Sequence, residues 1–407
     1  MRDRAPISHS LPEPGFPEGR TRVTVDLDQF ARNVRKVAES LRKNEGLLPV
    51  IKANAYGHGL LPVMTALSSM GIDRVAVMGA DEALSLRRGG FTGTIVLLGG
   101  FSGPELSLCF KERLTPVLHH REQLRLLEGD SPPHSILDLH LKIDSGMGRL
   151  GFLPEEIPEI LGLLSGISNA RITGIMTHFP LSEDRKDTES CLELFRNTVL
   201  PILSHPSLSD LSVIHMANSG AVMQGLVSFE ALHPSGRPLT FWARPGLILY
   251  GHLPLAGDTG WSEIAPILTV EARLLSVRTL PKGHSVSYGR TEVLSRDSRI
   301  GILGMGYADG LSRELSGRGW GVIDGRMVPF AGRVCMDMVA VDLTGLRREP
   351  KVGEWVKIIN PRDAESMTVD QIARWTGTIP YEVLCLLGHR SDRRFVGDAG
   401  RSLENSR

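Results

Sequence analysis

The chain has 407 residues, more than one compact core usually contains, so two domains are expected. Lysine plus arginine and aspartate plus glutamate each number 46, and the resulting net charge of zero gives no general attraction to nucleic acid or to an anionic membrane. The composition therefore excludes a protein that binds nucleic acid through its overall charge, and it favours a small-molecule partner.

Residues 1–20 predict a flexible N-terminal extension, because they are rich in proline and charge and contain no apolar stretch of the kind found in signal peptides. Nowhere do eighteen apolar residues follow one another, so no contact with a membrane is expected. The four cysteines are far apart and form no CxxC pair, which argues against a zinc ribbon and a disulfide framework. We expect a cytoplasmic protein without a bound metal.

From residue 21 onwards, helical and strand patterns alternate. Residues 26–43 carry apolar side chains at helical spacing and predict an amphipathic helix. Apolar strand patterns follow at 47–51, 74–78, 94–98, 115–118, 136–144, 172–177 and 211–216, with helical patterns between them. Such alternation is typical of a parallel sheet covered by helices. About eight units in some 240 residues predict a (β/α)8 TIM-type barrel over residues 21–262, with a doubly wound sheet as the alternative.

After about Trp261 the pattern changes to short β-rich segments broken by glycine, without long helices between them. Examples are "ILTVEARLLSVRTL", "SRIGILGMGY" and "EWVKIIN". This pattern is typical of an antiparallel sheet, so residues 263–407 are predicted to form a mostly-β C-terminal domain.

Lys52 directly follows the apolar run "LLPVI", which would place its amine at the C-terminal end of a barrel strand. In parallel barrels this end carries the functional loops. A lysine that merely reaches the surface is the alternative interpretation. A lysine that is partly removed from water has a lowered pKa, and the neutral amine can then form a Schiff base with an aldehyde cofactor.

The segment "VIKANAYGHG" (50–59) resembles the pyridoxal-phosphate lysine motif of alanine racemases, and eight further segments resemble the same family in the same order. They are "LKIDSGMGRLGF", "MTHF", "HMANSGA", "RPGLILYG", "SVSYGR", "GYADG", "GRVCMDM" and "YEVLC". The resemblance covers about residues 21–395. It implies a barrel followed by a β-domain, pyridoxal 5'-phosphate as the cofactor, alanine as the substrate, and a homodimer whose active sites are shared between two chains.

Racemisation removes the α-proton from one face of the substrate and returns a proton to the other, so two acid/base groups are needed. The resemblance assigns these roles to Lys52 and, from the neighbouring chain, Tyr288. It also implies that His178 contacts the tyrosine and that Arg244 contacts His178. In the family this arginine faces the pyridine nitrogen of the cofactor. Because a guanidinium keeps its proton, the ring nitrogen stays unprotonated and transamination is suppressed.

The remaining site residues are also implied by the resemblance. For the cofactor phosphate they are Tyr56, Ser219, Tyr381 and the amides of Gly246 and Leu247. For the substrate carboxylate they are Arg149 and the amide of Met336, with Lys142 supporting the arginine and carbamylated in many relatives. Asp337 would position the partner-side loop, Tyr288 and Tyr381 would form an inner gate, and Tyr307, Arg313, Arg333 and Ile379 would line an outer access corridor.

Two stretches depart from the family pattern. The acidic residue of the corridor would be Glu183 or Asp184, and the segment between Ser219 and Arg244 is longer than usual. The alternatives are a broad-specificity, serine or lysine racemase, a decarboxylase of the same fold, and a non-catalytic cofactor carrier. The decarboxylases pair an acid with the ring nitrogen, which disagrees with Arg244, and the carriers lack a second domain. The favoured function is an alanine racemase that supplies D-alanine for peptidoglycan.

Overall fold

The computed structural model describes residues 19–129, 135–231, 236, 238–255 and 260–398. The described chain divides into two compact units, one formed by Asp28–Pro266 and the other by residues 19–27 and 267–398. Almost all of the predicted extension 1–20, and part of the long segment between Ser219 and Arg244, lie outside the described residues.

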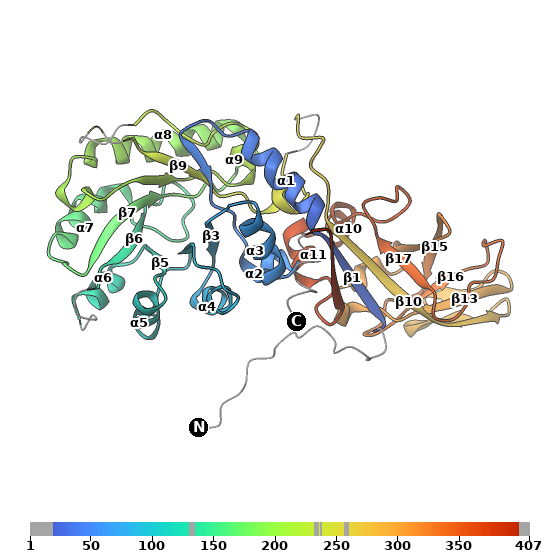
Figure 1. Ribbon diagram of the computed structural model, residues 1–407. Helices are drawn as coiled ribbons and strands as arrows, with labels where there is room; N and C mark the ends of the chain where they lie inside the picture. The colour runs from blue at the N-terminus through green and yellow to red at the C-terminus, as the bar shows by residue number, and fades with distance from the viewer. Residues whose placement is uncertain (1–18, 130–134, 232–235, 237, 256–259, 399–407) are drawn as a thin grey trace, which may run out of the picture. The chain divides into compact units, whose positions relative to one another are not determined.

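The first unit is a parallel barrel with helices on its outside (Figure 1), as predicted. Its eight strands pair in the order β2-β9-β8-β7-β6-β5-β4-β3. Their bounds are β2 Glu45–Leu47, β3 Arg74–Val77, β4 Thr94–Leu97, β5 Thr115–Leu118, β6 Leu137–Lys142, β7 Ala170–Met176, β8 Val213–His215 and β9 Thr240–Ala243. The two ends of this sheet meet where the Ile51 amide donates to the Ala76 carbonyl at 2.9 Å. Strand β9 was not among the predicted strands, because it lies inside the long segment before Arg244.

The helices of this unit bury one apolar face against the barrel. Helix α1 (Leu27–Glu39) shows the reason, because Phe30, Val34 and Val37 recur at helical spacing and have no exposed surface. The other α-helices are α3 Leu60–Ser69, α4 Ala80–Arg88, α5 Gly103–Lys111, α6 Arg121–Glu128, α7 Ile157–Leu164, α8 Arg185–Ile202 and α9 Ser219–Met223, while the short element α2 Lys52–Tyr56 has left-handed backbone angles. Short 3₁₀ turns occur at η1 Pro154–Glu156, η2 Pro206–Leu208 and η3 Leu247–Tyr250.

The second unit is built on one mostly antiparallel sheet in the order β13-β16-β15-β14-β17-β10-β1-β18, with a further β13–β10 pairing that closes six strands into a barrel. The strands are β1 Thr21–Asp26, β10 Leu268–Leu280, β13 Ser298–Leu303, β14 Trp320–Ile323, β15 Arg326–Ala331, β16 Val339–Asp342, β17 Trp355–Ile359 and β18 Asp392–Val396. A hairpin (β11 Ser285–Val286, β12 Glu292–Val293), helices α10 Val369–Thr376 and α11 Pro380–Leu386, and turns η4 Tyr288–Arg290, η5 Tyr307–Asp309 and η6 Arg313–Leu315 complete it.

The division of the chain differs from the expected one at its first strand. Residues 21–26 were assigned to the barrel, whereas β1 pairs antiparallel with β10, with Thr21 opposite Ala272 and Val25 opposite Leu268. The reason is the alternation of buried and half-buried residues along β1, which suits a sheet with one covered face. The boundary between the units falls between Pro266 and Ile267 rather than at 262.

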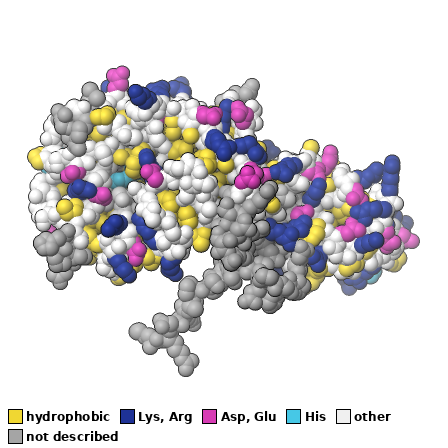
Figure 2. Space-filling view, in the orientation of Figure 1, with side chains coloured by type: hydrophobic (Ala, Val, Ile, Leu, Met, Phe, Trp, Pro, Cys, Tyr) yellow, Lys and Arg dark blue, Asp and Glu magenta, His cyan; other side chains and the backbone are white. Residues whose placement is uncertain are grey.

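The surface carries both signs of charge. Figure 2 shows lysine and arginine side chains interspersed with aspartate and glutamate on the visible face, in line with the equal numbers of the two kinds. No helix in the described part of the chain is long and apolar enough to cross a bilayer.

Candidate functional site

Lys52 lies five residues after the end of strand β2, at the start of a left-handed turn. Ile51 before it is fully buried, and all four residues from Ala53 to Tyr56 have φ between 53° and 54°. Each non-glycine residue in this conformation costs about 1 to 2 kcal/mol, so the surrounding structure must hold the turn in place. The Ala53 amide donates to the Glu82 carboxylate at 2.6 Å, and the Asn54 side chain accepts from the Leu60 amide at 2.8 Å. The backbone that presents Lys52 is therefore rigidly defined.

Arg244 lies at the centre of a buried hydrogen-bond network. Only 3% of this residue is exposed. Its guanidinium donates to the carbonyls of Thr177 at 2.6 Å and Met216 at 3.0 Å, to Nδ1 of His215 at 3.1 Å, and to Nδ1 of His178 at 3.2 Å. Burial lowers the pKa of Arg244 to about 9, which is still above neutral pH, so the group remains a cation.

The guanidinium determines the protonation of the histidines around it. An imidazole nitrogen that accepts from arginine carries no proton, so neutral His178 and His215 hold their proton on Nε2. Nε2 of His215 then donates to Nδ1 of His140 at 2.8 Å. Burial, with the charge of Arg244 as a further cause, holds the pKa of His178 well below its usual range and lowers that of His140 to about 3. These imidazoles are neutral at physiological pH.

Four cationic side chains gather around the same part of the barrel. Besides burial, the charges of Arg244, Arg149, Lys142 and Lys52 all lower the pKa of His178. Lys142, at the end of β6, is itself buried, and burial followed by the charges of Arg244 and Arg149 lowers its pKa to about 8. Arg149 is exposed on the loop after β6. The barrel end thus has a concentrated positive potential suited to an anionic ligand.

A second group of polar atoms surrounds Ser219. Its hydroxyl oxygen accepts from the amides of Gly246 at 3.1 Å and Ile248 at 3.4 Å. A side chain at Gly246 would lie 2.3 Å from the hydroxyl oxygen of Tyr56, so only glycine allows this close approach. Tyr56, Ser219 and Gly246 therefore lie close together, with Leu247 next to Gly246 in turn η3, while the part played by Ile248 was not foreseen.

The other predicted residues lie in the second unit. Tyr288 is 72% exposed at the tip of the β11–β12 hairpin. Tyr307 and Met336 lie on two loops joined by backbone bonds, since the Tyr307 amide donates to the Cys335 carbonyl and the Ala308 amide to the Met336 carbonyl, both at 3.0 Å. Arg333 packs over Gly289, where an added side chain would lie 3.1 Å from its guanidinium carbon. Arg313 starts turn η6, while Ile379 precedes helix α11 and Tyr381 lies in its first turn.

Asp337 belongs to a network of four charged side chains in this unit. Arg390 contacts Asp337 at 2.7 Å and Asp309 at 3.1 Å, and Arg20 lies 3.7 Å from both carboxylates. Asp309 is fully buried and also accepts from the Gly306 amide at 3.0 Å. The network therefore ties the loops of Tyr307 and Met336 to each other.

We expect Asp309→Asn to lower the free energy of unfolding of this unit by about 2 to 3 kcal/mol, because it removes a buried charge from two arginines. The matched control is Asp324→Asn, which removes an exposed carboxylate paired with Arg348 and should leave the free energy of unfolding nearly unchanged. Denaturant unfolding of both variants compares the two losses. If both variants lose the same free energy of unfolding, the buried network does not hold the loops of Tyr307 and Met336 together.

Several features were not foreseen or take another role. His140 and His215 had no predicted function, although both lie in apolar strands where a histidine needs a buried partner. Asp184, a candidate for the corridor, instead caps helix α8 by accepting from the amides of Lys186 and Asp187. Glu183 is exposed beside it.

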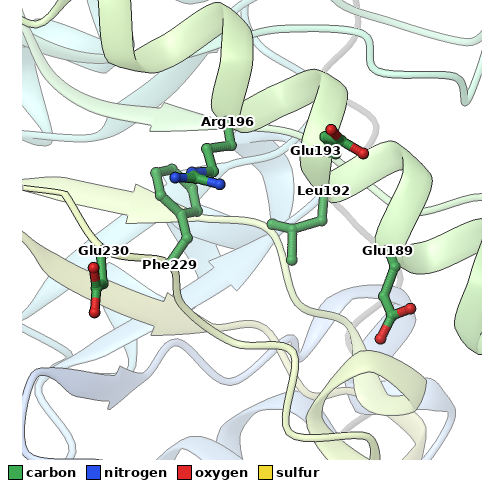
Figure 3. A pocket seen from close by; sticks show the side chains of 6 residues that line it. All are labelled: Glu189, Leu192, Glu193, Arg196, Phe229 and Glu230. Carbon is green, nitrogen blue, oxygen red and sulfur yellow. The ribbon is translucent and has the colours of Figure 1, made fainter.

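A surface groove lies apart from these groups, between helix α8 and the segment that carries Phe229 and Glu230 (Figure 3). Its lining residues are Glu189, Leu192, Glu193, Arg196, Phe229 and Glu230. None of the predicted site residues lines it. Among the residues that the structure describes, no cluster of histidine, cysteine and acidic side chains could hold a metal ion.

Comparison with known proteins agrees with this arrangement. Residues 25–254 match the N-terminal domain model of alanine racemases and residues 267–395 the C-terminal one. The alanine racemase of Thermodesulfovibrio yellowstonii is 34% identical over 376 residues, covering 91% of this chain and 96% of the relative. The biosynthetic enzyme of Pseudomonas aeruginosa aligns with a TM-score of 0.77 at 33% identity, covering 93% and 99% of the two chains.

A further structure, the alanine racemase of Bartonella henselae with covalently bound pyridoxal phosphate, aligns with a TM-score of 0.78 at 26% identity over 93% of this chain and all of the other. Both domain models match in the expected order and together cover most of the sequence. The chain therefore belongs to the alanine racemase family.

Proposed function

We propose that this protein interconverts L- and D-alanine with pyridoxal 5'-phosphate, and that Lys52 and Tyr288 are its two proton-transferring residues. The observation that carries the proposal is the grouping of Lys52, Lys142, Arg149 and Arg244 around neutral His178 at one end of the barrel. The amine of Lys52, the guanidinium of Arg244, which is cationic at neutral pH, and donors that suit an anion occur together there.

The residues present suit the cofactor. When bound, pyridoxal phosphate withdraws electrons from the α-carbon of an amino acid and so makes its proton acidic. The amine of Lys52 can hold the aldehyde. Gly246 lies so close to Tyr56, beside the Ser219 hydroxyl, that any larger side chain would fill the space between them. The backbone amides and the hydroxyl groups around this space suit a phosphate.

Each residue then has a definite task. Lys52 takes a proton from, or returns one to, one face of the α-carbon, and Tyr288 does so on the other face. Arg244 remains cationic and donates to His178, so His178 offers only its Nε2 proton toward its next neighbour. A neutral His178 that donates a hydrogen bond to the Tyr288 oxygen would stabilise negative charge on that oxygen during proton transfer.

The substrate carboxylate would be bound by Arg149 and by the amide of Met336. A guanidinium suits a carboxylate because it can bond both oxygens. Tyr288 and Tyr381 would form an inner gate that leaves room for little more than a methyl group, with Tyr307, Arg313, Arg333 and Ile379 lining the corridor outside it. This crowding favours alanine by about 1 to 3 kcal/mol for each additional methylene.

The proposal includes a homodimer with shared active sites. Tyr288, Met336 and Ile379 expose 72%, 53% and 58% of their surface in the single chain. Large exposed apolar side chains at site positions are typical of a surface that another chain covers. We also propose a cytoplasmic location and a role in supplying D-alanine for peptidoglycan, on the basis of the scattered cysteines and the family.

A panel of L-amino acids incubated in deuterated water tests the function. We expect inversion with deuterium at the α-carbon for alanine, and much slower inversion for serine and larger side chains. Comparable rates for lysine or arginine would indicate a broad-specificity racemase, and release of carbon dioxide without inversion would indicate a decarboxylase.

Lys142 gives a pH-dependent prediction. Its pKa in the fold is about 8 against an ordinary value of 10.5, so the charged form is disfavoured by the fold. This penalty is complete below pH 8 and disappears as the pH rises through 10.5. In buffer free of carbon dioxide, Lys142→Met should therefore exceed the natural protein in unfolding free energy by about 3 kcal/mol at pH 7, with no advantage above pH 10.5.

Bicarbonate provides the control, because carbon dioxide reacts with a neutral amine. If Lys142 is carbamylated and supports Arg149, bicarbonate should stabilise the natural protein and leave Lys142→Met unchanged. An advantage of the variant that does not depend on pH would contradict the lowered pKa.

A further inference from the structure

The hairpin that carries Tyr288 is small. Only two residue pairs join its strands, Ser285 with Val293 and Val286 with Glu292. Val286 is buried in an apolar cluster with Leu294 and Ile300, whereas Tyr288 is 72% exposed two residues further on. The base of the hairpin is therefore anchored, but its strand pairing does little to fix the direction of the phenol.

Ser287, immediately before Tyr288, has a backbone conformation that only glycine adopts readily. Its φ is 66° and its ψ is −173°. A residue with a side chain is strained in this region, and such strain persists only where the surrounding structure enforces it. Gly289 and Arg290, on the other side of Tyr288, also have positive φ values of 73° and 49°. The turn is thus unusually constrained on both sides of the phenol.

The side chain of Ser287 makes the contacts that enforce this turn. Its hydroxyl donates to the Arg333 carbonyl at 2.6 Å and lies 3.3 Å from Sγ of Cys335. The two segments are closely packed, because an added side chain at Gly332 would lie 2.5 Å from the Val286 carbonyl oxygen. Residues 333–335, which Ser287 contacts, are followed directly by Met336. The carbonyl of Cys335 also accepts a hydrogen bond from the Tyr307 amide. The hydroxyl therefore links the Tyr288 turn to the other site loops of this unit.

We infer that Ser287 is a positioning residue for Tyr288, whose hydroxyl holds the strained turn against residues 333–335 and so sets the direction of the phenol. The inference rests on the proposed role of Tyr288 as a base. A glycine at position 287 would relieve the strain, so a serine is useful there only through its hydroxyl.

The test is Ser287→Gly, which removes the hydroxyl and suits the positive φ. The thermal midpoint should not fall, because relief of strain offsets the lost bond. The kcat for alanine should fall roughly tenfold with little change in KM, because misplacement of a base affects the proton transfer rather than binding. The matched control, Ser285→Gly in strand β11, should keep kcat within about twofold.

Two further measurements separate positioning from a general structural role. In a Tyr288→Phe background, Ser287→Gly should cause no further loss, because it acts only through the phenol. The chain has five tyrosines, so fluorotyrosine labelling should give five signals, and Ser287→Gly should broaden or shift that of Tyr288 selectively. The Tyr288→Phe spectrum assigns this signal.

An unchanged kcat, an equal loss in the Tyr288→Phe background, or an undisturbed Tyr288 signal would overturn the inference. If Tyr288→Phe itself leaves α-proton exchange intact for both enantiomers of alanine, the proposed role of Tyr288 fails instead. The fluorine spectrum of Ser287→Gly would still report whether Ser287 orders the phenol, so the two failures can be told apart.

Discussion

Lys52→Ala is expected to abolish the visible absorption band of covalently held cofactor and to slow racemisation by at least about 10³-fold. Lys52 follows the buried Ile51 and begins the left-handed turn that ends at Tyr56. The substitution removes both the attachment point of the aldehyde and the proton-transferring group on one face. Absorption spectra of the purified variant, with and without added cofactor, measure the first effect.

Lys43→Ala is the control, because Lys43 is an exposed lysine just after helix α1. It should leave the band and the rate unchanged. A normal band in Lys52→Ala would remove Lys52 from the proposed chemistry.

Mixing two inactive variants extends this test to the dimer. If each site takes Lys52 from one chain and Tyr288 from the other, a mixed dimer of Lys52→Ala and Tyr288→Phe chains has one intact site. Random exchange of subunits should then restore about a quarter of the natural activity. If both residues of a site come from the same chain, mixing should restore nothing.

Tyr288→Phe is expected to slow racemisation by roughly 10² to 10⁴-fold, the contribution of one positioned acid/base group. The loss must be the same from L- and from D-alanine when measured as kcat/KM, because the two enantiomers are equally stable in solution. The informative quantity is exchange of the α-proton for deuterium without inversion. It should continue for the enantiomer whose proton faces Lys52 and stop for the other.

Nuclear magnetic resonance of each enantiomer in deuterated water measures this asymmetry. Tyr307→Phe is the matched control, since it removes a phenol hydroxyl from a neighbouring loop of the same unit, and it should slow exchange of both enantiomers to the same small extent. Equal loss of exchange from both enantiomers in Tyr288→Phe would contradict the assignment of one residue to each face.

The sequence alone was sufficient for the family and for the two kinds of domain, because both follow from patterns of neighbouring residues along the chain. Apolar strands that alternate with helices require a covered parallel sheet, and the motif around Lys52 is read from ten consecutive letters. Helix α1 was predictable for the same reason, since its buried face follows from spacing along the chain.

Only the tertiary structure decided which distant residues act together. Strand β1 joins the β-domain because its partner, β10, lies more than two hundred residues later in the chain. His140 and His215 become part of the Arg244 network through strands that are neighbours in space, and Ser287 gains its role from the carbonyl of Arg333. Such hydrogen bonds depend on the distance and angle between donor and acceptor, and the local sequence pattern does not specify these for residues that are far apart in the chain.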